Sequence, residues 1–142
     1  NYIYGLIESI RVLTKKTLVV KLPPNPEIIT TLAKACRQGG AEAITATNTI
    51  KALTIDADGD IVMGGMSGEY LKPISLRCVY EIANIPGWDI PIIGCGGIRT
   101  IKDVQDYMRV GASAVQVGLA GLEDPHVINK LNREWKNGNN RS

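Results

Sequence analysis

The sequence predicts an α/β protein in which helices alternate with the strands of a parallel sheet. Short runs rich in β-branched residues are each followed by a segment whose apolar residues recur at helical spacing. These runs are apolar at nearly every position, which is typical of parallel strands covered on both faces. Periodicity alone leaves open whether the strands form a small doubly wound sheet or half of an eight-stranded barrel. In either fold, ligands bind beyond the carboxyl ends of the strands.

The chain opens with an amphipathic segment, after which the residues TLVVKL at 17–22 predict the first strand. Apolar side chains then recur at helical spacing from Ile28 to Cys36, which predicts the first helix of the alternation. The pair Gly39-Gly40 is expected to end that helix. The run EAITATNT at 42–49 predicts the second strand.

A hairpin is expected before the next helix. Asp58-Gly59 separates two alternating runs between residues 53 and 65, and this dipeptide is a strong signal for a turn. The residues at 72–85 predict a helix, with Pro73 at a first-turn position that tolerates proline. The run IPIIGC at 90–95 predicts the third strand.

The last two strand–helix units complete the alternation. Residues 100–112 predict a helix with Thr100 as its N-cap and Asp103, three residues later, as a partner of the capping-box type. The run SAVQVGLA at 113–120 predicts the fourth strand. Residues 124–138 predict the final helix, with Asp124 as N-cap and a proline at its first position.

Composition restricts the class of protein. The chain has 142 residues, 44% of them hydrophobic, which is enough for one domain with a core. Its net charge of +2 offers no electrostatic footprint for nucleic acid or an anionic membrane. No apolar run is long enough to span a membrane, so we expect a cytoplasmic protein. Because the chain begins at Asn1 rather than Met, we expect a piece of a longer polypeptide.

The sulfur and imidazole side chains do not form a metal-binding motif. The three cysteines, Cys36, Cys78 and Cys95, are widely spaced and suit a reducing compartment. Cys36 and Cys78 fall on helix faces and Cys95 on a strand, so we expect all three to be packing residues. His126, the one histidine, lies near the start of the final helix, where we expect it to be solvated.

Polar side chains stand where the first two strands end. Lys21 interrupts the apolar run LVVKL, and burial of a lysine without an anionic partner would be costly. It therefore either faces a ligand or extends its ammonium group to solvent at the rim. Asn48 and Thr49 follow the second strand and could present several donors and acceptors to a planar polar ligand. Ordinary turn chemistry would also account for them.

Glycines stand at three separate strand-to-helix junctions. Gly68 precedes the helix at 72–85, Gly96-Gly97 follows the third strand and Gly118 follows the fourth. Backbone N–H groups exposed by such glycines can converge on a phosphate group. Tight strand-to-helix turns are the alternative explanation for each junction taken separately.

Five stretches together resemble one enzyme family: VVKLPPN, TATNTI, GGMSGEYLKPISLRCVYEI, IPIIGCGGIRTIKDVQDYMRVGASAVQVGLA and DPHVINKL. In order and spacing they are similar to the C-terminal half of the class 1 dihydroorotate dehydrogenases, and MSGEYLKP is closer to the class 1B branch. The resemblance implies a (β/α)8 TIM barrel. Residues 1–142 would supply its last four βα units, a half-barrel.

The resemblance also implies an FMN cofactor and assigns residues to it. Lys21 and Thr47 would contact the flavin, and Asn48 and Thr49 would bind the pyrimidine substrate. Leu119 stands at a cofactor position where the family usually has threonine, so one hydroxyl donor to the phosphate is lost. The remaining phosphate contacts would come from Gly68, Gly96, Gly97 and Gly118.

The implied reaction is the oxidation of dihydroorotate to orotate in pyrimidine biosynthesis. No catalytic residue is expected in this chain, because the cysteine or serine base of the family belongs to the N-terminal half. The expected partners are therefore that missing half-barrel, a second copy or an electron-transfer subunit. Two alternatives remain open, namely the flavin domain of a dihydropyrimidine dehydrogenase and a catalytically silent half-barrel that binds phosphate-bearing ligands.

Overall fold

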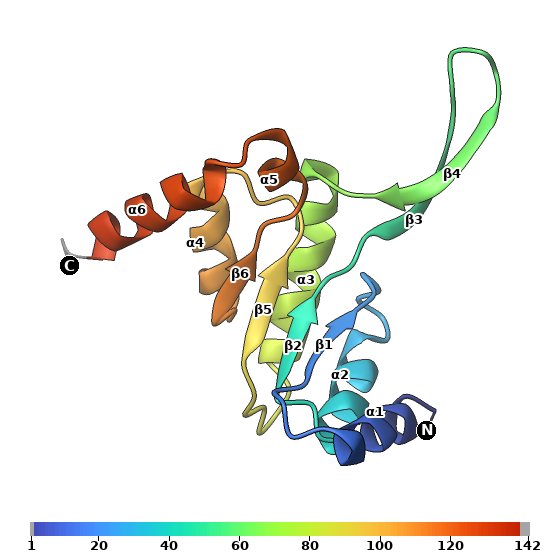
Figure 1. The fold of residues 1–142 in the computed structure, drawn as a ribbon, viewed down its shortest axis with the longest axis vertical. Helices are drawn as coiled ribbons and strands as arrows, with labels where there is room; N and C mark the ends of the chain where they lie inside the picture. Colours follow the sequence, from blue (N-terminus) through green and yellow to red (C-terminus); the bar gives the residue numbers. More distant parts are fainter. Residues whose placement is uncertain (1, 140–142) are drawn as a thin grey trace.

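A computed structural model describes residues 2–139 and contains a four-stranded parallel sheet. Its strands lie in the order β1, β2, β5, β6, so the sheet follows the sequence from one edge to the other (Figure 1). Their bounds are β1 Val19–Leu22, β2 Ala43–Ala46, β5 Ile92–Cys95 and β6 Ala114–Gln116. The predicted α/β fold with a parallel sheet is thereby confirmed.

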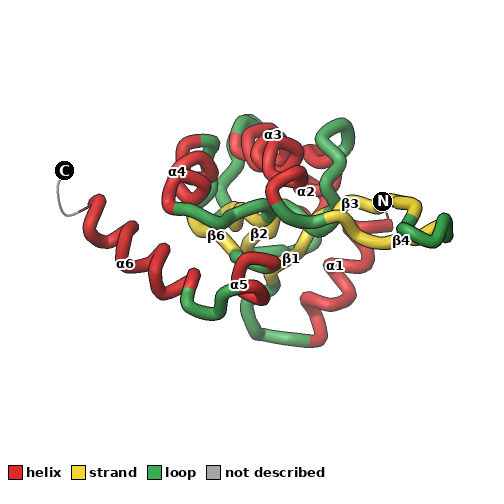
Figure 2. Tube along the Cα trace, turned by 90° about the horizontal axis from the view of Figure 1, so that it is seen from above, coloured by secondary structure: helices red, strands yellow, loops and turns green. Residues whose placement is uncertain are grey.

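Three helices cover one face of this sheet. They are α2 (Ile29–Gln38), α3 (Lys72–Ala83) and α4 (Ile101–Arg109), and they lie together on the same side of the strands (Figure 2). A further helix, α1 (Tyr2–Leu13), packs against α2. No helix in the described part of the chain is long and apolar enough to cross a membrane.

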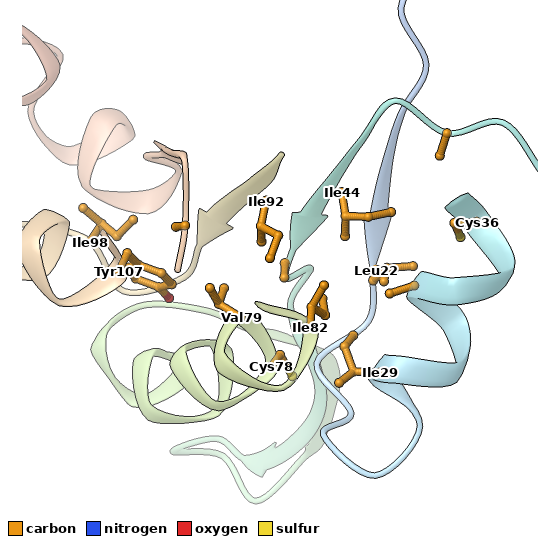
Figure 3. Close-up of a cluster of buried hydrophobic side chains, with 14 of the residues drawn as sticks. Leu22, Ile29, Cys36, Ile44, Cys78, Val79, Ile82, Ile92, Ile98 and Tyr107 are labelled. Carbon is orange, nitrogen blue, oxygen red and sulfur yellow. The ribbon is translucent and has the colours of Figure 1, made fainter. Parts of the chain in front are cut away.

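The core fills the space between the sheet and these helices (Figure 3). Alternate residues of neighbouring strands point to the same face, so Ile44 and Ile92, which are register partners, both face the helices. Across from them, Val79 and Ile82 of α3 are fully buried. Cys36 and Cys78 also lie in this core, as expected.

The predicted hairpin forms and is longer than expected. Strands β3 (Ile50–Ile55) and β4 (Ile61–Met66) pair in antiparallel register and project from the body of the molecule (Figure 1). Gly59 has a φ of +88°, and its N–H donates to the carbonyl of Asp56 at 3.2 Å. The Asp58-Gly59 turn is thus confirmed, and its glycine takes the left-handed position.

Two strands end earlier than the sequence predicts. β2 stops at Ala46, and β6 stops at Gln116, where a strand to residue 120 was expected. A short helix, α5 (Leu119–Glu123), replaces the end of that expected strand. The reason is the loss of a partner, because Gln116 pairs with Cys95 and the next residue of the neighbouring strand, Gly96, leaves the ladder with a φ of +137°.

The start of the final helix is also corrected. Helix α6 spans Val127–Asn139, so Asp124 is not its N-cap as expected. Asp124 instead ends α5, and its Oδ1 accepts the N–H of His126 at 2.9 Å in a turn between the two helices. His126 is exposed, as expected. At α4 the expected capping box is confirmed, with Thr100 and Asp103 bonded reciprocally.

The expectation that every strand is covered on both faces is wrong for the outer strands. All four residues of β2 are buried, but Val19 and Lys21 of β1 and Ala114 and Gln116 of β6 are exposed. These exposed side chains alternate with the helix-facing ones, so they belong to the opposite face. Among residues 2–139 this face has no layer of helices like that of α2, α3 and α4, although α1 and α5 are drawn on its side of the strands in Figure 2, and β1 and β6 each pair with one strand only.

Candidate functional site

A cavity of about 510 Å³ opens at the carboxyl ends of the parallel strands. It is bordered by Lys21 of β1, by the segments that follow β2, β5 and β6 and by the loop that precedes α3. This is the edge at which parallel sheets bind ligands. Every site residue expected from the sequence lines it: Lys21, Thr47, Asn48, Thr49, Gly68, Gly96, Gly97, Gly118 and Leu119.

The charge of this cavity is positive. Both charged side chains that line it, Lys21 and Arg99, are cations. Lys21 is exposed at the end of β1, and its Nζ lies 3.6 Å from the Sγ of the buried Cys95. Arg99 is held at the rim by an ion pair of 2.6 Å with Glu123. The arrangement suits a ligand that carries negative charge.

The two polar residues after β2 are accessible to a ligand. The side chains of Asn48 and Thr49 are exposed, while the backbone N–H of Asn48 donates to the carbonyl of Leu22 at 2.8 Å. This bond continues the β1–β2 pairing by one step and fixes where Asn48 leaves the sheet. Both residues also border a more open groove beside the proline-rich segment 23–26.

Gly97 and Gly118 both line the cavity, but only at Gly97 would a side chain clash with the rest of the protein. A Cβ on Gly97, which has a φ of +66°, would lie 2.7 Å from the carbonyl oxygen of Gly68, so these two loops are in direct contact. A Cβ on Gly118 would meet no atom within 4 Å. The packing of the protein therefore does not require a glycine at position 118. A ligand that approaches the backbone closely at this position would require one.

A buried polar layer lies directly beneath the cavity. The hydroxyl groups of Thr47 and Ser75 are hydrogen-bonded at 2.7 Å, and the hydroxyl of Tyr107 donates to the carbonyl of Gly96 at 2.7 Å. The hydroxyl of Thr47 is thus engaged with α3, and other atoms of this residue border the cavity. Burial strongly raises the pKa of Tyr107, so its phenol stays protonated and acts as a donor.

A charged cluster of Lys72, Asp103 and Asp106 connects the start of α3 to α4. The Nζ of Lys72 lies 2.5 Å from Asp103 Oδ1 and 2.8 Å from Asp106 Oδ2. Asp103 also accepts the backbone N–H groups of Arg99 and Thr100 at 3.0 and 2.8 Å. Burial by itself would raise the pKa of Asp103, but the bonds from Lys72, Arg99 and Thr100 outweigh it and lower the pKa to about 2.

Sequence reasoning did not identify Ser75, Lys72 or Tyr107 as parts of the site. Each occupies a helix position that reads as ordinary, and each meets its partner only in the folded chain. The signal in the sequence was weak in every case. Ser75 is a small polar residue on a buried helix face, and Lys72 directly follows the loop that carries Gly68.

The fold and the site define a class, namely an α/β protein with a glycine-lined, cationic cavity at the carboxyl edge of a parallel sheet. The family model for dihydroorotate dehydrogenase matches residues 3–137. The chain belongs to the dihydroorotate dehydrogenase family, as the resemblance of its motifs indicated.

Individual relatives agree with this assignment. The chain is 42% identical over 131 residues to the dihydroorotate dehydrogenase B (NAD(+)) catalytic subunit of Bacteroides thetaiotaomicron, covering 89% of this chain and 43% of the relative. It is 42% identical over 123 residues to the protein of the same description from Pyrococcus horikoshii, covering 83% and 40%. The expected class 1B branch is therefore confirmed, and the chain spans about two fifths of the length of these relatives.

Proposed function

We propose that this chain forms the cofactor-binding half of an FMN-dependent dihydroorotate dehydrogenase, with a (β/α)8 barrel as the complete fold. The observation that carries the proposal is one cavity that gathers the glycine loops after three elements with an exposed lysine and an Asn-Thr pair. Membership of the family supports it independently, because the match extends from residue 3 to residue 137.

The residues present fit FMN. The cavity of about 510 Å³ lies within the range of small-molecule sites. Its glycine loops present backbone N–H groups that suit a phosphate, and both of its charged side chains are cations. Gly118 leaves open space where any side chain would stand. When bound, FMN supplies the hydride acceptor for the oxidation of the substrate.

In this proposal each group of residues has a defined task. Gly68, Gly96, Gly97 and Gly118 hold the phosphate through their backbone. Lys21 places a positive charge beside the flavin ring and favours its electron-rich reduced form. Asn48 and Thr49 orient the pyrimidine ring of dihydroorotate through hydrogen bonds.

The rest of the machinery is proposed to come from other parts of the assembly. The curated relatives are longer than this chain, and we propose that their preceding region corresponds to the half-barrel that supplies the base for the C5 proton. These relatives are described as catalytic subunits of NAD(+) enzymes, which supports a second subunit that passes electrons to NAD(+).

Flavin titration tests the cofactor assignment. The purified protein should bind FMN more tightly than riboflavin, because only FMN carries the phosphate. Gly97→Ala should weaken FMN binding by about tenfold or more, since its Cβ would press on Gly68. Gly64→Ala is the matched control, because a Cβ there meets nothing within 4 Å. Equal affinity for the two flavins would overturn the phosphate site.

Substrate choice tests the activity. The complete enzyme should oxidise dihydroorotate with concurrent bleaching of the flavin absorbance. Lys21→Met should slow this reduction or weaken FMN binding. If a dihydropyrimidine without the carboxylate reduces the bound flavin and dihydroorotate does not, the protein is a dihydropyrimidine dehydrogenase instead. A protein that binds FMN and is bleached by neither compound would be the catalytically silent binder.

A further inference from the structure

We propose that Tyr107 is a positioning residue that turns the backbone N–H of Gly97 toward the phosphate site. Tyr107 lies on α4, behind the cavity, and does not line it. It would therefore act on a ligand through the peptide group that it holds. The inference rests on the proposed function, because it assigns a task within the FMN phosphate site.

Tyr107 holds the peptide group between Gly96 and Gly97 by a hydrogen bond. The hydroxyl of Tyr107 donates to the carbonyl oxygen of Gly96 at 2.7 Å. That carbonyl belongs to the peptide group between Gly96 and Gly97, which is trans. In a planar trans peptide the C=O and N–H bonds point in opposite directions. The bond from Tyr107 therefore directs the N–H of Gly97 away from α4, toward the side on which the cavity lies.

The N–H of Gly97 is available to donate a hydrogen bond to a ligand. Within residues 2–139 the structure gives the N–H of Gly97 no hydrogen-bond acceptor. Gly97 itself lines the cavity. A backbone donor at such a place is satisfied by a ligand or by water. A phosphate oxygen is a suitable acceptor, because bonds to a charged acceptor are the stronger ones.

The ring of Tyr107 is itself held in place by the core and by Gly94. Its ring is fully buried in the core, where Figure 3 shows it beside Val79. It packs so closely on Gly94 of β5 that a Cβ there would overlap the ring. With the ring fixed from below, the hydroxyl reaches the carbonyl of Gly96 from a defined direction. A flexible surface side chain could not orient a peptide group in this way.

The backbone of Gly96 has little room to move on the side of α3. A Cβ on Gly96 would lie 2.5 Å from the Oγ of Ser75, so the backbone of Gly96 rests directly on α3. This contact limits the position of the loop but does not by itself fix the rotation of the peptide group between Gly96 and Gly97. The hydrogen bond from Tyr107 removes that freedom. Its loss should let the peptide group rotate without unfolding the loop.

The experiment removes one oxygen atom. Tyr107→Phe keeps the ring that packs on Gly94 and deletes the donor to Gly96. Tyr80→Phe is the matched control, because Tyr80 is 51% exposed on α3 and does not line the cavity. The dissociation constants of FMN and riboflavin are measured for the wild-type protein and both variants. We expect Tyr107→Phe to weaken FMN binding by about tenfold, leave riboflavin binding within about twofold, and Tyr80→Phe to change neither.

The preference for FMN over riboflavin separates positioning from a general structural role. A parallel loss of affinity for both flavins, or no loss for either, would overturn the role of Tyr107. A wild-type protein with no preference for FMN would overturn the proposed phosphate site and this inference with it.

Should Tyr107→Phe fail to fold, the wild-type protein still tests whether the N–H of Gly97 contacts the phosphate, which the inference requires. In its ¹⁵N–¹H spectrum, FMN should shift the Gly97 amide resonance strongly downfield, and riboflavin should not. A Gly97 resonance that FMN leaves unmoved would contradict the inference.

Discussion

In the proposed phosphate site, we expect one side chain, Leu119, to limit the number of hydrogen bonds to the phosphate. It lines the cavity directly after Gly118, at a position where the resemblance of the motifs implies threonine. Leu119→Thr would return a hydroxyl donor to a charged acceptor, and such bonds contribute roughly 1.5–3 kcal/mol. We expect FMN affinity to rise by about tenfold or more and riboflavin affinity to stay the same, measured by fluorescence titration. An unchanged FMN affinity would place the residue outside the phosphate contacts.

At the same scale, Asp103 links stability to pH. Its folded pKa of about 2 lies below the usual 3.8, so the ionised form is favoured by folding. The stabilisation is therefore complete above about pH 4 and is lost as the pH falls from about 4 to about 2. Asp103→Asn should lower the free energy of unfolding by about 1–2 kcal/mol at pH 7.

Urea denaturation of both proteins at several pH values checks this dependence on Asp103. The difference between wild type and Asp103→Asn should shrink as the pH falls toward 2. Glu27→Gln is the control, because Glu27 is an exposed carboxylate whose side chain has no hydrogen bond or ion pair to the residues that the structure describes. A difference that stays constant from about pH 7 to about pH 2.5 would contradict the assignment.

Among the elements, helices α1 and α2 offer two glycines that should respond to alanine with opposite signs. Gly5 lies inside α1, and a Cβ there would meet no atom within 4 Å, so Gly5→Ala should stabilise the protein by about 0.5–1 kcal/mol. Gly40, after α2, has a φ of +101°, and its Cβ would press on Arg11 at 2.9 Å. Gly40→Ala should cost about 1–2 kcal/mol. Urea midpoints of the two variants measure this contrast, and shifts of equal sign would refute it.

The ends of elements show where local sequence stops being sufficient. The run SAVQVGLA has strand-like composition through residue 120, yet β6 ends at Gln116 because its neighbour β5 ends at Cys95. Whether a partner strand continues is a property of the fold. By contrast, the end of α2 at Gly39-Gly40 and the capping box of α4 depend on residues a few positions apart, and both could be predicted from the sequence.

The candidate site divides in the same way. Lys21, Asn48 and the glycines could be predicted because parallel strands bring their carboxyl ends to one edge. The residues behind the cavity could not. The pairing of Thr47 with Ser75 joins positions 28 residues apart, and that of Lys72 with Asp103 joins positions 31 apart. Such pairs depend on how helices seat on the sheet, which periodicity does not specify.

At the scale of the whole molecule, β1 and β6 are the outer strands of the sheet, and each has one edge that pairs with no other strand of residues 2–139. The carbonyl groups of Leu18, just before β1, and of Leu22, at its end, accept N–H groups of Glu42 and Asn48 on the β2 side. Because successive residues of a strand point their backbone groups to opposite sides, the N–H of Val19 faces the open edge. In the proposed barrel this edge pairs with the preceding strand, and the edge at β6 with the first strand. Open edges of this kind favour association with another chain.

The last prediction follows from those edges. The 142 residues expressed alone should self-associate and should not oxidise dihydroorotate. Co-expression with the preceding region of the Bacteroides thetaiotaomicron relative should give one soluble particle that retains FMN, because the two pieces would close both edges. Val19→Pro deletes an outward N–H and spares the β1–β2 ladder, so it should weaken this assembly. Size-exclusion chromatography and flavin absorbance measure both effects. A monodisperse monomer of this chain that turns over at roughly 1 per second or faster would contradict the proposed half-barrel, because it would need neither a partner nor a base from outside.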